Sequence, residues 1–321
     1  MYCKDGFCYA MTAFICNKKS KTDIDIYYTY YDIKQKEKYL SHSYNIDAKI
    51  ESLFYNGTYW YMIPYNQNEL FFINDKYIEK KIDSIFDLEL RVIRDLAWNI
   101  NKKIWVVVGG DSYINQIYYY DYSSNEWENI PHNFNSFANK VACNNDYFLI
   151  SGGGVGYEQK IIKWVNNDEN ILEITVPLNK INGLVWNKVQ KKWVVFGDNI
   201  IYSTDDCSNW ETGDKEIFSN VLDVACNDNI WIAVGEKKNG LAGDVMAYSD
   251  NGNKWYAMGQ NLFERGTQII WNGNVFIAMG YSTGSKSIIY YSSEGTKWTK
   301  LDMSMFESEI YSIATSFIAD Q

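Results

Sequence analysis

The sequence is poor in the residues and patterns that mark several common classes of protein. Only 3 prolines and 2 histidines occur in 321 residues, so a histidine-rich metal centre is excluded. No two cysteines form a CxxC pair, which leaves a zinc ribbon unsupported. No apolar run approaches the roughly 18 residues that a membrane-spanning helix needs. Acidic residues outnumber basic ones by 40 to 30, which argues against a nucleic-acid-binding surface.

The N-terminus lacks the basic stretch followed by an apolar one that marks a secretory signal. The six cysteines fit buried free thiols better than disulfides, since free cysteine behaves as a small hydrophobic residue. Cys143 and Cys226 occupy the same place in a repeated apolar strand, and we expect both to be buried. An intracellular, reducing location follows as an expectation.

What the sequence does contain is aromatic residues and a repeat. Aromatic residues reach 17%, which favours strands. An apolar tripeptide followed by Asn, a polar turn and an apolar run that often ends in Gly recurs along the chain. Counting two degenerate copies at the ends, the turn positions fall near residues 4, 56, 99, 144, 187, 227, 272 and 315. Their spacing averages about 44 residues, the period of a β-propeller blade.

Each repeat unit reads as four strands, named A to D in chain order. Strand A is the apolar tripeptide, strand B the run that ends in Gly, strand C a Tyr-rich segment, and strand D begins near a Trp. The sequence therefore predicts an all-β fold: a seven-bladed β-propeller with four-stranded antiparallel blades in a single domain, residues 1–321. The first unit lacks its own strand A. We expect the C-terminal strand, residues 309–315, to close the ring by joining the N-terminal three strands, with Phe7–Met11 as its partner.

Particular residues carry two resemblances. Gly109-Gly110, Tyr120-Asp121 and Trp127 resemble a kelch repeat. The segments Ser203–Trp210, Ser249–Trp255 and Ser292–Trp298 resemble the Asp-box (BNR-type) turn of sialidase-like propellers, with Cys207 where Gly is usual. The repeat phrase as a whole is similar to uncharacterised repeat proteins of large DNA viruses such as the mimiviruses. That resemblance implies a host-cytoplasmic or virion location and identifies no activity.

The candidate site lies on the face that the B–C and D–A loops share. Those loops differ between units, and irregular loops on a regular scaffold are where specificity tends to reside. The candidate binding residues are listed here: Tyr157, Glu236, Lys237, Lys238, Glu264 and Arg265. No catalytic or metal-binding residue is predicted, and no cofactor.

A sialidase would need three arginines that converge on a carboxylate, but Arg91 and Arg94 of an extended segment point to opposite faces. The leading hypothesis is thus a non-catalytic scaffold that binds a protein partner and neither nucleic acid nor membrane. A glycan-binding or carbohydrate-active propeller is the alternative by fold analogy, and a structural component of a virion or inclusion is a third.

Overall fold

A computed structural model describes the backbone of most of the chain. The described residues are 2–4, 7–9, 12–17, 23–29, 40–45, 50–56, 60–64, 71–74, 77–79, 92–110, 115–124, 126–134, 137–153, 158–165, 171–203, 207–213, 217–238, 244–259, 262–284, 286–306 and 310–315. No helix within these residues has the length and hydrophobicity needed to cross a membrane.

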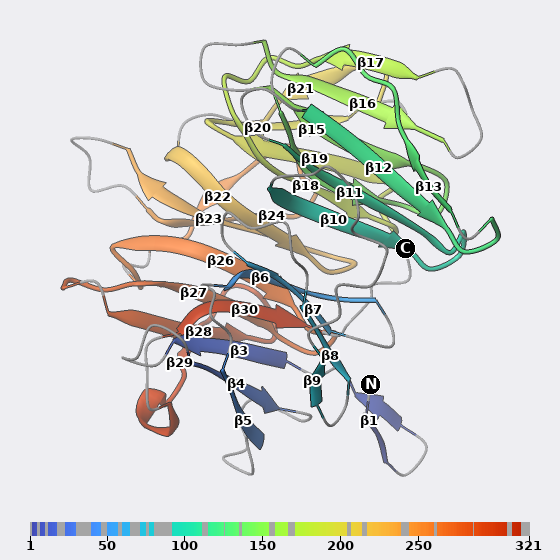
Figure 1. The fold of residues 1–321 in the computed structure, drawn as a ribbon. Helices are drawn as coiled ribbons and strands as arrows, with labels where there is room; N and C mark the ends of the chain where they lie inside the picture. Colours follow the sequence, from blue (N-terminus) through green and yellow to red (C-terminus); the bar gives the residue numbers. More distant parts are fainter. Residues whose placement is uncertain are drawn as a thin grey trace.

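Within the described residues, strand pairing produces seven four-stranded antiparallel units, which we call blades (Figure 1). Blades 6 and 7 are joined into one sheet by a single bridge between them. The strands, in the order A to D, are as follows: blade 1, β30 (Ile310–Thr315), β3 (Thr12–Asn17), β4 (Asp23–Thr29), β5 (Leu40–Asn45); blade 2, β6 (Ile50–Tyr55), β7 (Trp60–Pro64), β8 (Phe71–Asn74), β9 (Tyr77–Glu79); blade 3, β10 (Ile93–Asn99), β11 (Ile104–Gly110), β12 (Asn115–Asp121), β13 (Glu126–Asn129); blade 4, β14 (Ala138–Cys143), β15 (Phe148–Gly152), β16 (Lys160–Trp164), β17 (Leu172–Thr175); blade 5, β18 (Ile181–Asn187), β19 (Lys192–Gly197), β20 (Ile200–Ser203), β21 (Trp210–Thr212); blade 6, β22 (Phe218–Cys226), β23 (Trp231–Lys237), β24 (Met246–Ser249), β25 (Tyr256–Ala257); blade 7, β26 (Arg265–Trp271), β27 (Phe276–Tyr281), β28 (Ser287–Ser292), β29 (Thr299–Lys300).

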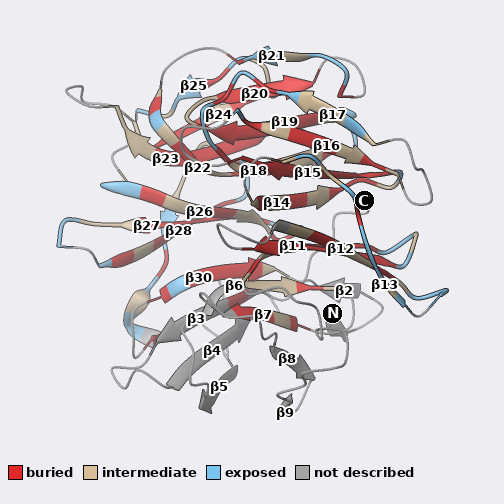
Figure 2. Cartoon of the chain, turned by 45° about the horizontal axis from the view of Figure 1, so that its top comes forward, coloured by how far each residue is buried: buried red, intermediate tan, exposed pale blue. Residues whose placement is uncertain are grey.

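Contacts between neighbouring blades run around a closed ring, mostly from one A strand to the next. Strand β30 contacts β6, β10 contacts β7 and then β14, and the contacts continue through β18, β22 and β26 back to β30. In blades 3 to 7 the B strands are the most buried, as β11 shows along its whole length, whereas D strands such as β13 and β25 face solvent (Figure 2). Apolar residues of neighbouring blades pack together between the sheets. The all-β propeller with four-stranded antiparallel blades is therefore confirmed.

Ring closure by the C-terminal strand is also confirmed, but its partner differs from the expected one. Strand β30 pairs with β3, with Ala314 opposite Ala13 and Ile313 opposite Phe14. The expected partner, Phe7–Met11, instead contributes β2 (Phe7–Tyr9) to a separate hairpin with β1 (Tyr2–Lys4). Both N-terminal segments are apolar, so composition did not distinguish them. The extra hairpin accounts for the long first interval of the repeat.

The repeated asparagine closes the A–B turn and links neighbouring blades. Asn99 Oδ1 accepts hydrogen bonds from the backbone amides of Asn101 (3.1 Å) and Lys102 (2.9 Å), while Asn99 Nδ2 donates to the Asn144 carbonyl of the next blade at 2.7 Å. Asn187 repeats the link to the Asn227 carbonyl at 2.8 Å. The same turn geometry recurs at further turn asparagines: Asn144, Asn227 and Asn272. Asparagine recurs at this position along the chain because its side-chain oxygen accepts hydrogen bonds from turn amides that have no strand partner.

The two cysteines of strand A both point at the preceding blade, but they differ in burial. Cys143 is buried, and its Sγ lies 3.4 Å from the Trp98 carbonyl oxygen. Cys226 Sγ lies 3.6 Å from the Trp186 carbonyl oxygen, yet the residue is only half-buried, which corrects the expectation. Cys226 lines a cavity at the A–B end of the ring, which leaves part of the residue exposed. Desolvation of the thiol still raises the pKa of Cys226 to about 12.

Candidate functional site: the loop face of blades 6 and 7 and the ring interior

Four of the predicted site residues meet where blades 6 and 7 join. The bridge between β23 and β26 places Glu236 directly opposite Arg265. Arg265 Nη2 lies 2.9 Å from Glu236 Oε1, and Lys237 Nζ lies 3.6 Å from Glu264 Oε2. We call these four residues the interblade cluster. It lies where β23 leads into the B–C loop of blade 6 and where the D–A loop between blades 6 and 7 enters β26, on the predicted face.

Hydrogen bonds fix the backbone beneath the cluster. Asn220 Nδ2 donates to Glu236 Oε2 at 3.2 Å, and Ser219 Oγ donates to the Lys237 carbonyl at 2.9 Å. The Glu264 amide donates to the Tyr281 carbonyl at 2.8 Å. The side chains are partly exposed to water, 59% for Glu264 and 49% for Arg265 but only 31% for Lys237 and 35% for Glu236. Exposed ion pairs add little to stability, typically about 0–1 kcal/mol, so the cluster is positioned without being needed for folding.

The other predicted residues are placed as follows. Lys238 is half-buried and directly follows the cluster in the chain. Tyr157 lies outside the described residues. The guanidinium of Arg94 lies 3.9 Å from the centre of the Phe137 ring, and its Nε donates to the Gly110 carbonyl at 3.3 Å, so it packs at the end of blade 3. In the part of the chain that the structure describes, no three His, Cys, Asp or Glu side chains lie close enough to hold a metal ion.

A second set of polar residues, which the sequence analysis missed, lines the inner edge of the ring. They stand directly before the apolar tripeptide of strand A. Asp95 Oδ2 accepts from the Val141 amide of the next blade at 3.1 Å, and Asp223 Oδ2 accepts from the Ile269 amide at 2.9 Å. Strand A has no ladder partner on its inner side, so these side chains bond amides that would otherwise stay unpaired. The fixed offset from the turn asparagine is the pattern that could have identified them.

Gln268 makes the same kind of link between blade 7 and the closing strand β30. This link also shows that the predicted turn position of the last repeat unit is wrong. Gln268 Oε1 accepts from the Ile313 amide at 3.0 Å, so Ile313 takes the place of Val141 and Ile269. The predicted turn position 315 is therefore one residue too early. The C-terminal copy is degenerate and carries no turn asparagine, so only its hydrogen bonds reveal the phase.

The two aspartates lie in an unusual electrostatic setting. Desolvation raises the pKa of Asp95, opposed chiefly by the Lys140 ammonium at 4.0 Å. Desolvation raises the pKa of Asp223 to about 7, opposed by its bonds from Ile269 and Val224 and by Lys140. Both carboxyl groups are already engaged with backbone amides of the next blade or their own. This arrangement suits a role in holding blades together.

Comparisons with known proteins reveal a similarity of fold alone. No family model matches the chain, and no curated protein matches it. Among the solved structures that match is a chain from a crystal structure of a nidogen/laminin complex, with a TM-score of 0.54 and 8% sequence identity. The match covers 96% of this chain and 98% of that one. Nearly the whole chain therefore shares its architecture with that protein, at an identity too low to carry function.

Proposed function

We propose that this protein is a non-catalytic interaction scaffold that binds a protein partner through the loop face of blades 6 and 7. The observation that carries the proposal is the interblade cluster. Charges of both signs are partly exposed there, at strand ends whose backbones are held by hydrogen bonds within each blade and by the β23–β26 bridge between the blades. A site that is already ordered loses less entropy on binding.

The charge pattern of the cluster suits a protein as binding partner better than a polyanion. Two carboxylates stand among the cations of the cluster, and the chain carries a net charge of −10. Complementary charges at an interface determine mainly specificity and the rate of association. The structurally similar chain comes from a protein–protein complex, which agrees with this use of the fold.

The test is affinity purification from the native cell with partners identified by mass spectrometry. We expect the double variant Lys237→Glu/Arg265→Glu to lose a partner that the wild type retains. The matched control is Lys254→Glu/Lys297→Glu, which makes the same change of charge in the C–D turns on the opposite face. The control should keep the partner, and both variants should melt within a few degrees of the wild type because the altered groups are surface charges. Equal partner recovery from both variants would refute the proposal, as would the absence of any specific partner.

A further inference from the structure

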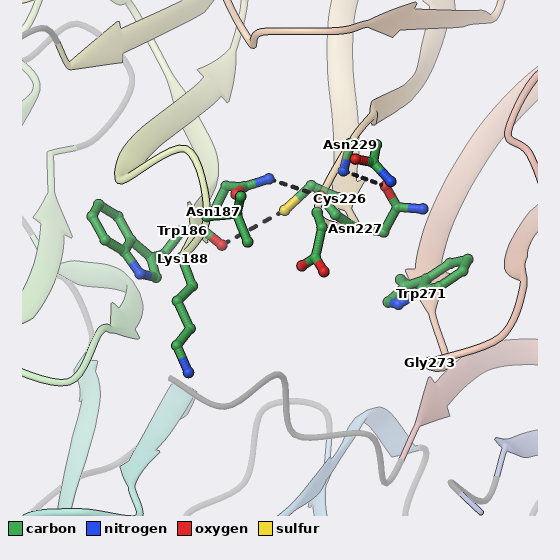
Figure 3. A pocket seen from close by; sticks show the side chains of 10 residues that line it. Trp186, Asn187, Lys188, Cys226, Asn227, Asn229, Trp271 and Gly273 are labelled. Carbon is green, nitrogen blue, oxygen red and sulfur yellow. Dashed lines mark hydrogen bonds between the residues drawn. The ribbon is translucent and has the colours of Figure 1, made fainter.

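The A–B face of the ring, opposite the interblade cluster, carries a cavity of about 580 Å³. Three successive A–B turns build it, from blades 5, 6 and 7. Its lining, drawn in Figure 3, comprises Trp186, Asn187, Lys188, Val189, Cys226, Asn227, Asp228, Asn229, Trp271 and Gly273. Its volume lies within the range of about 300–1,000 Å³ typical of small-molecule sites.

The residues that precede the three turn asparagines differ in size around this cavity. Trp186, Cys226 and Trp271 occupy the same position of three consecutive A strands, directly before the turn asparagine. The cysteine is much smaller than the indoles on either side of it (Figure 3). Both tryptophans are half-buried, and both contribute to the lining of the cavity. Since the pKa of the Cys226 thiol is raised to about 12, the thiol stays neutral; it lines the cavity and does not act as a nucleophile.

Within the part of the chain that the structure describes, several polar groups around the cavity take no part in the hydrogen bonds of the fold. Among the described residues, no hydrogen-bond acceptor is found for the indole N–H groups of Trp186 and Trp271 or for Asn227 Nδ2. The Asp228 carboxylate likewise has no donor there. In the Asn227 side chain, Oδ1 accepts from the Asn229 and Ile230 amides at 2.9 Å, whereas the amide nitrogen projects away from the turn (Figure 3).

We propose that this cavity binds a neutral saccharide. Aromatic rings supply the apolar surface against which the faces of a sugar ring pack, while indole and amide donors beside a carboxylate acceptor match hydroxyl groups, which both donate and accept. The lining carries one carboxylate, Asp228, and one ammonium, Lys188, so its charges balance, which favours a neutral ligand over a nucleotide or other anion. This site is independent of the proposed protein-binding face.

The first experiment screens the intact protein on a glycan array and then titrates the best glycan, following tryptophan fluorescence. We expect binding to change the emission, since two indoles line the cavity. Asp228→Ala should weaken binding by tenfold to a hundredfold, the effect of one hydrogen bond to a charged group. The matched control is Asp146→Ala, which alters an exposed aspartate in the corresponding turn of blade 4 and should bind as the wild type does.

A second variant keeps the test independent of that single carboxylate. Cys226→Phe fills the hollow between the two tryptophans and should abolish binding while the protein still unfolds cooperatively. Lys237→Glu/Arg265→Glu should bind the glycan normally, so failure here is distinguishable from failure of the protein-binding proposal. The absence of any glycan ligand would overturn the inference. So would a glycan affinity that neither Asp228→Ala nor Cys226→Phe changes, or binding of a peptide in its place.

Discussion

Asp223 joins blades 6 and 7 through a carboxyl group that burial disfavours in its charged form. The pKa of Asp223 is raised to about 7 from an ordinary value of 3.8. Between these values the unfolded chain releases the proton and the folded protein keeps it. The stabilising contribution of the protonated carboxyl is therefore complete below about pH 3.8 and is lost as the pH rises towards 7, by at most about 1.4 kcal/mol per pH unit.

We expect Asp223→Asn to remove this pH dependence. Relative to the wild type, the variant should gain stability as the pH rises from about 4 to about 7 and no further above it, because only the wild type loses the contribution of a protonated carboxyl over that interval. Melting temperatures of both proteins across that interval provide the measurement. Asp250→Asn, at an exposed turn position, is the control and should differ from the wild type by a constant amount. A difference for Asp223→Asn that does not change with pH would contradict the argument.

Cys207 shows what single residues reveal in sequence and what they hide. The sequence places it where the related turns have glycine, and the structure gives it a φ of 72°, beside 75° at Gly252 and 80° at Gly295. Residues other than glycine rarely adopt this left-handed backbone conformation. Its Sγ lies 3.4 Å from the hydroxyl of Tyr147, 60 residues earlier in the chain, within a buried cluster. The turn was thus predictable from local sequence, but the packing that tolerates a cysteine there is long-range.

At the scale of the strand, the glycine that ends strand B follows from a bulge in strand A. The pairing of β18 with β19 shifts register between Ile181 and Gly183. A Cβ added to Gly197, the last residue of β19, would overlap the Lys180 carbonyl oxygen. The sequence predicts the strands through their apolar runs and turn residues. It does not predict the bulges, because an extra unpaired residue alters the hydrogen-bond ladder without a pattern of its own.

We expect Gly197→Ala to destabilise the protein by about 3 kcal/mol, the upper end of the usual range for overpacking, since backbone must move to admit the methyl group. Gly284→Ala is the matched control. Gly284 has a φ of 87° but no atom within 4 Å of an added Cβ, so only backbone strain of about 1 kcal/mol is expected. Urea denaturation of the three proteins measures both losses. Equal losses would show that close approach of strand A is not the reason for the glycine.

At the scale of the whole molecule, the candidate site was only partly predictable. The loop face and its charged residues could be predicted because strand order alone decides which loops share a face. The cavity on the opposite face could not, since it depends on how large and small side chains of three blades pack at the end of the ring. The inner carboxyl groups bond amides about 46 residues away. We propose that such links between successive blades make residues 1–321 one folding domain.

The final prediction concerns ring closure. Strand β30 pairs with β3, contacts β6 and β26, and buries Ile310 and Ile313. Each buried isoleucine contributes about 1.5–3 kcal/mol and each backbone hydrogen bond about 1 kcal/mol net. Their sum is comparable with the whole stability of a domain, about 5–15 kcal/mol. Truncation after Met305 should therefore give aggregating protein rather than a slightly weakened one, because β3 would expose an unpaired inner edge. Removal of Asp320 and Gln321 alone is the control, and we expect it to leave solubility and melting temperature unchanged. A soluble Met305 truncation as thermostable as the full chain would show that the ring does not depend on its closing strand.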